Sequence, residues 1–276
     1  MIETKLVQKF GNSSHVVLPK EYVGRRIRFV TEPKTFQDIK SEIIGILRGY
    51  LENIIGVYLY GSYARGEQTI DSDIDILVIT AAKFKIMEKV DNYHVISTTI
   101  NDIENTLKNN AVLILPIIKE AKTIINPDLI NKYKNYKFTK RNTKKFLMDT
   151  KKILLLNKKG LKLDFEIGSL VYSLILRVRG LLIIKLVLNN SLYSKASLFD
   201  YLEGNNFEKN KIEELYRIYR SERDGNKVQN SNIIAKADIE KLLLVYERLL
   251  KEVGRLLRWA RKNTRKALKV LKKRCV

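Results

Sequence analysis

Residues 61–66 read Gly-Ser-Tyr-Ala-Arg-Gly, and residues 71–75 read Asp-Ser-Asp-Ile-Asp. Apolar runs at 54–60 and 74–79 flank these stretches, and each has the length of a buried β-strand. Side chains alternate faces along a strand, so Asp73 and Asp75 are expected on the same side, about 6–7 Å apart. Two carboxylates at that spacing repel each other unless a cation lies between them. The pattern therefore predicts a divalent-metal site at the start of the second strand.

The residues that precede the two acids are suited to holding a phosphate. Gly61 lets the backbone approach a phosphate closely, and Ser62 offers a hydroxyl and an N–H at an expected helix start. Mg²⁺, or Mn²⁺ in its place, takes a few carboxylate oxygens and completes its shell with water and substrate phosphates. A phosphate holder beside such a metal site predicts chemistry on a nucleoside triphosphate. The competing interpretation is an ordinary strand–turn–strand with solvated acids at one end.

The complete string, Gly-Ser followed by ten positions and Asp-Ile-Asp, resembles the DNA polymerase β-like nucleotidyltransferases, especially their minimal and kanamycin-type members. The resemblance implies transfer of a nucleoside monophosphate, usually AMP from ATP, to a hydroxyl acceptor with release of pyrophosphate. It implies that Gly61 and Ser62 hold the β,γ-phosphates and that Arg65 adds a phosphate contact. It also implies that Asp73 and Asp75 bind the metal ions. The acceptor stays open: a protein, an RNA or a small molecule.

The family uses a third carboxylate, on a later strand, as the base that deprotonates the acceptor hydroxyl. The corresponding strand is expected at 93–99, where the sequence has no acid and His94 stands near the expected place. A histidine can act as a base near neutral pH, although it bridges two Mg²⁺ ions less well than a carboxylate. His94 is therefore either the catalytic base or a strand histidine without a catalytic role. The missing acid favours a second hypothesis, a catalytically weak or inactive DNA-bound regulator of toxin–antitoxin or mobile-element type.

Composition narrows the class of protein. The 276 residues carry a formal net charge of +22, which attracts polyanions such as nucleic acid, an acidic partner or nucleotides. A single cysteine, Cys275, excludes an intrachain disulfide framework and fits a reducing compartment. The longest apolar stretch, 170–188, is interrupted by three basic residues and does not predict a membrane span. We expect a cytoplasmic protein that does not enter a membrane.

Residues 1–34 form the first of three expected units. Strands are expected at 5–10, 15–18 and 25–30, with one helical turn after Pro19. The unit is too short to close a core alone and should need a partner. Its string resembles the swapped-hairpin AbrB/SpoVT-type domain, which implies a homodimer with a DNA-binding basic face. A dimerisation device without DNA binding is the alternative. The candidate phosphate contacts are Lys5, Lys9, Arg25, Arg26 and Arg28.

The remainder divides into a nucleotidyltransferase domain at 35–135 and a helical bundle at 136–276. The first should be an α+β domain, a small mixed sheet with flanking helices, entered through an amphipathic helix over 36–51. The second begins with a basic connector over 131–162. Its central helix is expected at 163–189, with further helices over 198–202, 212–219 and 233–259. This pattern resembles HEPN-type domains and, almost as well, kanamycin-type bundles.

The C-terminal tail carries ten Lys and Arg residues over 255–274 and no acid. Leucines and other apolar residues between them form a loose stripe, so the segment predicts a basic amphipathic helix. Such a helix can bind nucleic acid, a membrane surface or an acidic partner. The alternative is a bundle helix with a solvated basic end.

Overall fold

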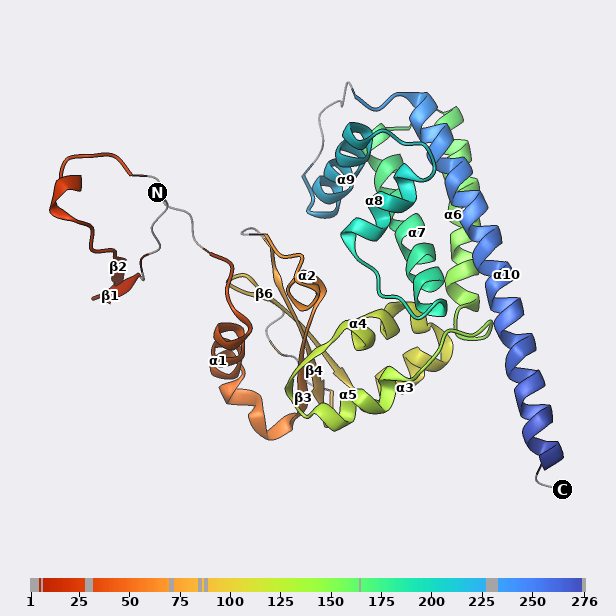
Figure 1. Ribbon diagram of the computed structural model, residues 1–276, viewed down its shortest axis with the longest axis horizontal. Coiled ribbons are helices and arrows are strands. Elements are labelled where there is room, and N and C mark those ends of the chain that lie inside the picture. The colour runs from red at the N-terminus through yellow and green to blue at the C-terminus, as the bar shows by residue number, and fades with distance from the viewer. Residues whose placement is uncertain are drawn as a thin grey trace. The chain divides into compact units, whose positions relative to one another are not determined.

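A computed structural model describes residues 5, 7–27, 32–69, 72–83, 86, 89–163, 165–226 and 233–274, without the side chains of 261 and 263–274. The chain divides into two compact units, Met1–Pro33 and Lys34–Val276 (Figure 1). Each unit is described by itself. No helix among the described residues is both long enough and apolar enough to cross a membrane.

The first unit is a small hairpin without a core of its own. Strands β1 (Gln8–Phe10) and β2 (Ser13–His15) pair antiparallel, and the 3-10 turn η1 (Lys20–Tyr22) follows Pro19. The strands expected at 5–10 and 15–18 are thus shorter, and the second begins earlier, because the chain already reverses at Gly11, which has a φ of +56°. Residues 25–27 are not in a strand, and Arg28 lies outside the described residues. Among the described residues of this unit, only Pro19 is even partly buried.

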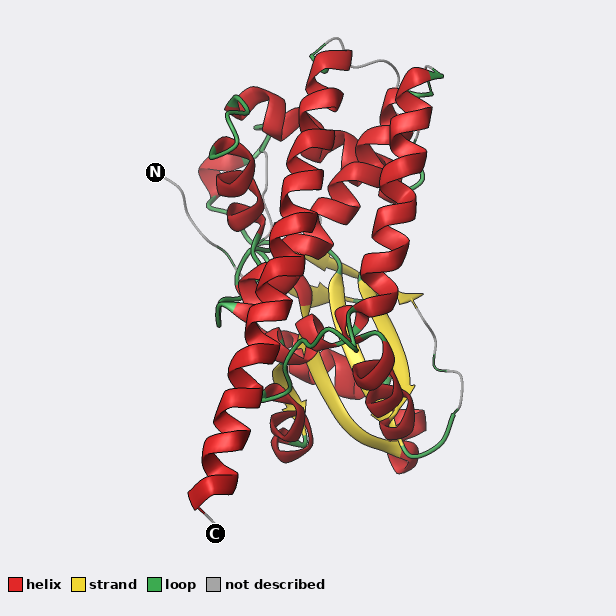
Figure 2. Ribbon diagram, turned by 90° about the vertical axis from the view of Figure 1, so that its right-hand side faces the viewer, coloured by secondary structure: helices red, strands yellow, loops and turns green. Residues whose placement is uncertain are grey.

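The second unit contains a five-stranded mixed sheet in the order β5-β6-β4-β3-β7 (Figure 2). The strands are β3 (Ile54–Tyr60), β4 (Ile74–Thr80), β5 (Lys89–Val90), β6 (Tyr93–Thr99) and β7 (Lys122–Ile125). Strands β4 and β6 run parallel, and the other neighbours run antiparallel. The strands expected from the motif and at 93–99 are confirmed. β4 lies at the centre of the sheet, which explains why its sequence is apolar on both faces.

Helices cover the two faces of this sheet. Ile76 and Val78 of β4 join one buried cluster, whereas Leu77 and Ile79 join the other, as the alternation of a strand requires. The first face is covered by α1 (Phe36–Ile46), which begins with a capping box between Thr35 and Asp38. The η2 turn (Arg48–Asn53) leads from α1 to β3. The helical elements on the second face are α3 (Ile100–Asn109), η3 (Ala111–Leu113), α4 (Leu115–Glu120) and α5 (Pro127–Lys134).

The C-terminal part is helical. Its helices are α6 (Lys144–Lys162), α7 (Ile167–Leu188), α8 (Lys195–Glu203), α9 (Lys209–Arg223) and α10 (Lys236–Arg274). α7 packs against α6, α9 and α10 and is buried on most sides, so the expected central helix is confirmed. The basic connector expected over 131–162 is divided between the end of α5 and the whole of α6. A turn in which Thr139 and Asn142 exchange side-chain-to-backbone hydrogen bonds separates α5 from α6.

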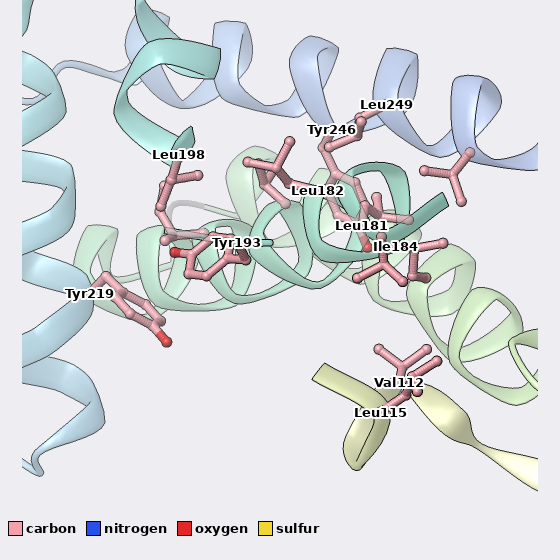
Figure 3. Close-up of a cluster of buried hydrophobic side chains, with 14 of the residues drawn as sticks. Val112, Leu115, Leu181, Leu182, Ile184, Tyr193, Leu198, Tyr219, Tyr246 and Leu249 are labelled. Atoms are coloured by element: carbon pink, nitrogen blue, oxygen red, sulfur yellow. The ribbon is translucent and has the colours of Figure 1, made fainter. Parts of the chain in front are cut away.

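The sheet and the bundle share one hydrophobic core. Tyr58 and Leu77 of the sheet belong to the same buried cluster as the apolar side chains of α4 and of the bundle helices. Figure 3 shows Leu115 of α4 facing Ile184 of α7 across this cluster. The sheet and the bundle are therefore joined by one continuous set of buried side chains, to which α4 contributes Leu115 and Ile118.

This arrangement predicts the effect of a pair of matched truncations. Leu115 is fully buried, so Leu115→Ala should lower the free energy of unfolding by about 2–5 kcal/mol through lost burial and a cavity. Leu113, two residues away, is 63% exposed, and Leu113→Ala should change it by less than about 0.5 kcal/mol. Urea unfolding followed by circular dichroism measures both. Equal effects of the two variants would contradict the shared core.

Candidate active site

The turn from β3 through α2 (Gly61–Arg65) into β4 builds the centre of the site. Gly61 has a φ of +76°, a conformation that other residues adopt only with strain. A Cβ atom at Gly61 would also overlap the Asp75 carboxylate, whose strand position pairs with Tyr60. Glycine is therefore required here for both reasons. Its backbone lies directly against a carboxylate that the sequence assigned to metal binding.

Asp75 is the partly buried member of the acidic pair. Its side chain is 28% exposed, whereas Asp73 precedes β4 and is exposed. Burial is the main reason that the pKa of Asp75 lies above its usual value. His94 opposes this rise, and the carboxylates of Asp73 and Glu120 add to it. The structure thus gathers negative charge around Asp75, which a bound cation would stabilise.

His94 lies beside Asp75 across the parallel β4–β6 pairing, where these two residues are register partners. The His94 Nδ1 atom is 3.5 Å from Asp75 Oδ1, and the imidazole is 51% exposed. β4 and β6 are neighbouring strands, so the side chains of Asp75 and His94 lie next to each other. The position expected for the third catalytic group is therefore beside the acidic pair. The role of His94 as base stays a prediction.

Glu120, the last residue of α4, is a site residue that sequence reasoning missed. Its Oε1 atom accepts a 2.9 Å hydrogen bond from the Gly61 N–H, and its Oε2 atom accepts one of 2.7 Å from Arg65 Nη1. Arg65 also donates from Nε to Glu67 at 2.7 Å. Gly61 and Arg65, which are both predicted to contact phosphate, therefore both donate hydrogen bonds to the Glu120 carboxylate. No sequence signal could have found Glu120, because it lies 59 residues after Gly61.

The same network reaches the helical bundle. Glu67 Oε1 accepts a 2.7 Å hydrogen bond from the backbone N–H of Lys195, the first residue of α8. The Arg65 guanidinium lies 6.0 Å from the ring centre of Tyr193, which is buried in the shared core. The site is consequently bordered by the bundle on the side of Arg65, and a ligand there would meet residues of both parts.

The acidic pair fits a divalent ion that takes most of its ligands from substrate. Among the described residues, no three His, Cys, Asp or Glu side chains are close enough to hold an ion by themselves. Mg²⁺ in nucleotide-handling proteins is characteristically bound by one or two carboxylates together with substrate phosphates. Asp73 and Asp75 supply that number of hard oxygen donors beside the Gly61 backbone. The donor set is therefore suited to Mg²⁺ or Mn²⁺ in the company of a nucleotide.

The residues predicted to contact DNA are in the first unit. Lys5, Lys9, Arg25 and Arg26 are exposed, and the Arg25 guanidinium lies 6.0 Å from the ring centre of Tyr22. Arg28 lies outside the described residues. Exposure leaves these cations accessible to a polyanion, and DNA binding remains a prediction.

Known proteins resemble this chain at several levels. One similar structure is the spectinomycin adenyltransferase AAD(9) from Enterococcus faecialis, solved with ATP and spectinomycin. It is 15% identical to this chain, with a TM-score of 0.44, and the match covers 78% of this chain and 100% of that protein. A nucleotidyltransferase-like protein from Exiguobacterium sibiricum is 13% identical over 79% of this chain and 78% of its own, with a TM-score of 0.36. A chain of a toxin–antitoxin structure with AMP-PNP is 20% identical, with a TM-score of 0.26. The match covers 34% of this chain and 80% of that one. Nothing about chemistry follows from scores this low.

No curated protein matches the chain closely enough to count as a relative. The sequence itself matches the family described as polymerase beta, nucleotidyltransferase, over residues 41–130. This range contains α4 and the sheet with its Gly61–Asp75 contact. The expected enzyme class is thereby confirmed, whereas the AbrB-like arm and the HEPN-like or kanamycin-type bundle stay predictions. The matched segment, residues 41–130, is similar to a polymerase β-type nucleotidyltransferase domain.

Proposed function

We propose that this protein transfers AMP from ATP to a hydroxyl acceptor in a Mg²⁺-dependent reaction. The observation that carries the proposal is the contact between the Gly61 backbone and the Asp75 carboxylate inside the matched nucleotidyltransferase range. This contact joins the expected phosphate holder to the expected metal ligand. The motif resembles the minimal and kanamycin-type nucleotidyltransferases, which usually transfer AMP, so ATP is the first substrate to test.

Phosphate binding at Gly61 would require Glu120 to move. The Gly61 N–H and the Arg65 guanidinium both donate to Glu120, so a phosphate oxygen that used them would replace that carboxylate. Both donors would then keep an anionic partner, which limits the cost of the exchange. Ser62, the next residue of α2, would add its hydroxyl to the same phosphate group.

Asp73 and Asp75 would hold the divalent ion. When bound, the ion neutralises phosphate charge and polarises the phosphorus centre for in-line attack. Asp75 would hold the ion next to β6, because His94 of that strand is its register partner. The pKa of Asp75 is already raised by burial, so cation binding there would also relieve an unfavourable buried charge.

His94 would take the proton of the acceptor hydroxyl. Its Nδ1 atom faces Asp75, which leaves Nε2 as the nitrogen for the hydroxyl. A hydrogen bond from Nδ1–H to a carboxylate fixes the imidazole tautomer and keeps Nε2 free to accept a proton. In this scheme Asp75 has two neighbours, the metal ion and the base.

The direct test of the function is incubation of the purified protein with α-labelled ATP and Mg²⁺. RNA, small hydroxyl compounds and proteins of the same host serve as acceptors. Formation of a labelled product together with pyrophosphate supports the proposal. ATP binding without transfer to any acceptor class would favour the regulator hypothesis, in which the domain senses nucleotide without turnover.

Replacing both acids tests the metal assignment. The Asp73→Asn, Asp75→Asn double variant should lose Mg²⁺-dependent ATP binding, because neutral amides are poor ligands for a hard cation. Its stability should be unchanged or higher, since substitution removes repulsion among neighbouring carboxylates. Calorimetric titration with and without Mg²⁺ gives the affinity, and thermal unfolding checks the fold. Undiminished Mg²⁺–ATP affinity in the folded double variant would remove these residues from the metal site.

Variants at His94 test the base. His94→Ala should lower turnover by about 10²–10⁴, the usual contribution of a general base, with little change in ATP affinity. His94→Asp restores a carboxylate at the position and should keep or raise activity. Single-turnover rates separate the chemical step from binding. An alanine variant within about twofold of the parent would assign His94 to a role without proton transfer.

We further infer that the first unit binds DNA and pairs two copies of the chain. Its described residues have no core of their own, and their exposed cations fit a phosphate backbone. Deleting residues 1–33 should therefore remove dimers and any sequence preference. In the full chain, DNA affinity should fall with salt at a slope of about −0.9 per neutralised phosphate. Gel shifts at two salt concentrations and solution scattering measure these effects. A truncated protein that is still dimeric and selective would place both properties elsewhere.

A further inference from the structure

A groove of about 800 Å³ runs between α6 and α10, away from the candidate active site. The two helices lie side by side in opposite directions (Figure 1). Tyr246 of α10 donates a 2.6 Å hydrogen bond to the Thr150 carbonyl of α6, which holds the helices together beside the groove. The groove is open along its length and belongs wholly to the second unit.

The floor of the groove is apolar and follows the helical repeat. Leu147 and Leu154 of α6 are seven residues apart, as are Leu250 and Leu257 of α10, so each pair lies on one helix face. Gly254 stands between the two α10 leucines. A Cβ atom there would meet only the Arg258 Nη1 atom, at 3.8 Å, so space above this glycine is open.

The rim of the groove is basic. Lys251, Arg255 and Arg258 follow the same repeat on α10, Lys140 precedes α6, and Lys151 lies between Leu147 and Leu154 along α6. Among the described residues that line the groove, only Glu247 is acidic, and it already pairs with Lys158. An apolar floor between rows of unneutralised cations matches a helix with an apolar stripe flanked by carboxylates.

We propose that the α6–α10 groove binds an acidic amphipathic helix of a partner protein. The same groove of a second copy is a poor occupant, because its rim carries the same positive charge and would repel this one. Nucleic acid matches the rim but leaves the leucine floor without an apolar partner. The leucines on α6 and α10 would receive the partner's apolar stripe, and the rim would fix its orientation.

The probe is a labelled synthetic helix of about 15 residues with a leucine stripe and flanking glutamates. Its control has lysine in place of each glutamate. Fluorescence anisotropy with the full-length protein should show at least about tenfold tighter binding of the glutamate peptide. Equal binding of both peptides overturns the proposal.

Two substitutions at Gly254 locate the binding. Gly254→Trp should fill the groove and weaken glutamate-peptide binding by about tenfold, whereas Gly254→Ala should leave it within about twofold. Circular dichroism checks that both variants fold, which the open space at Gly254 favours. A Gly254→Trp protein that binds as tightly as the parent overturns the proposal.

A charge reversal tests the rim independently. The Lys251→Glu, Arg255→Glu double variant should lose the preference for the glutamate peptide or bind the lysine peptide better. Duplex DNA, phosphatidylserine vesicles and self-association measured by scattering are the competing occupants. If Gly254→Trp abolishes one of these and leaves the peptide unaffected, the groove belongs to that occupant and the proposal is wrong.

Discussion

The contact between the Gly61 backbone and the Asp75 carboxylate is the constraint on which the site depends. It exists because β3 and β4 are antiparallel neighbours, with Tyr60 opposite Asp75. The chain must then turn at Gly61 with a positive φ, and a side chain there would collide with the carboxylate. The proposed phosphate holder, Gly61, and the proposed metal ligand, Asp75, are thereby fixed against each other at one end of β3 and β4.

The electrostatics of the site follow from the short distances between Asp75, its neighbouring carboxylates and the Gly61 backbone. Asp75 is partly buried and lies near two further carboxylates, so its ionised form is disfavoured in the absence of a cation. Glu120 occupies the Gly61 N–H and the Arg65 guanidinium, two donors that would otherwise face an incoming phosphate. The resting site therefore satisfies its donors internally. In the proposed function, a metal–nucleotide complex would supply a cation to Asp75 and an anion to the donors of Gly61 and Arg65.

The helical bundle is part of the same structural unit as this site. The shared core passes from β3 and β4 through α4 to α7, and the Glu67–Lys195 hydrogen bond adds a polar connection near the motif. α4 ends in Glu120, so the helix that joins the sheet to the bundle also delivers a carboxylate to the phosphate donors.

The sequence by itself determined the strands around the motif, the acidic pair, the position of His94 and the central helix α7. These features depend on the spacing of residues that are close together in the chain, so they can be predicted from the sequence. The tertiary structure alone decided the place of Glu120, because a contact across 59 residues leaves no local signal. It also decided the break between α5 and α6, where side-chain hydrogen bonds of Thr139 and Asn142 outweigh helical continuity. The α6–α10 groove was likewise not predictable from sequence, since its lining comes from two helices that are distant in the chain.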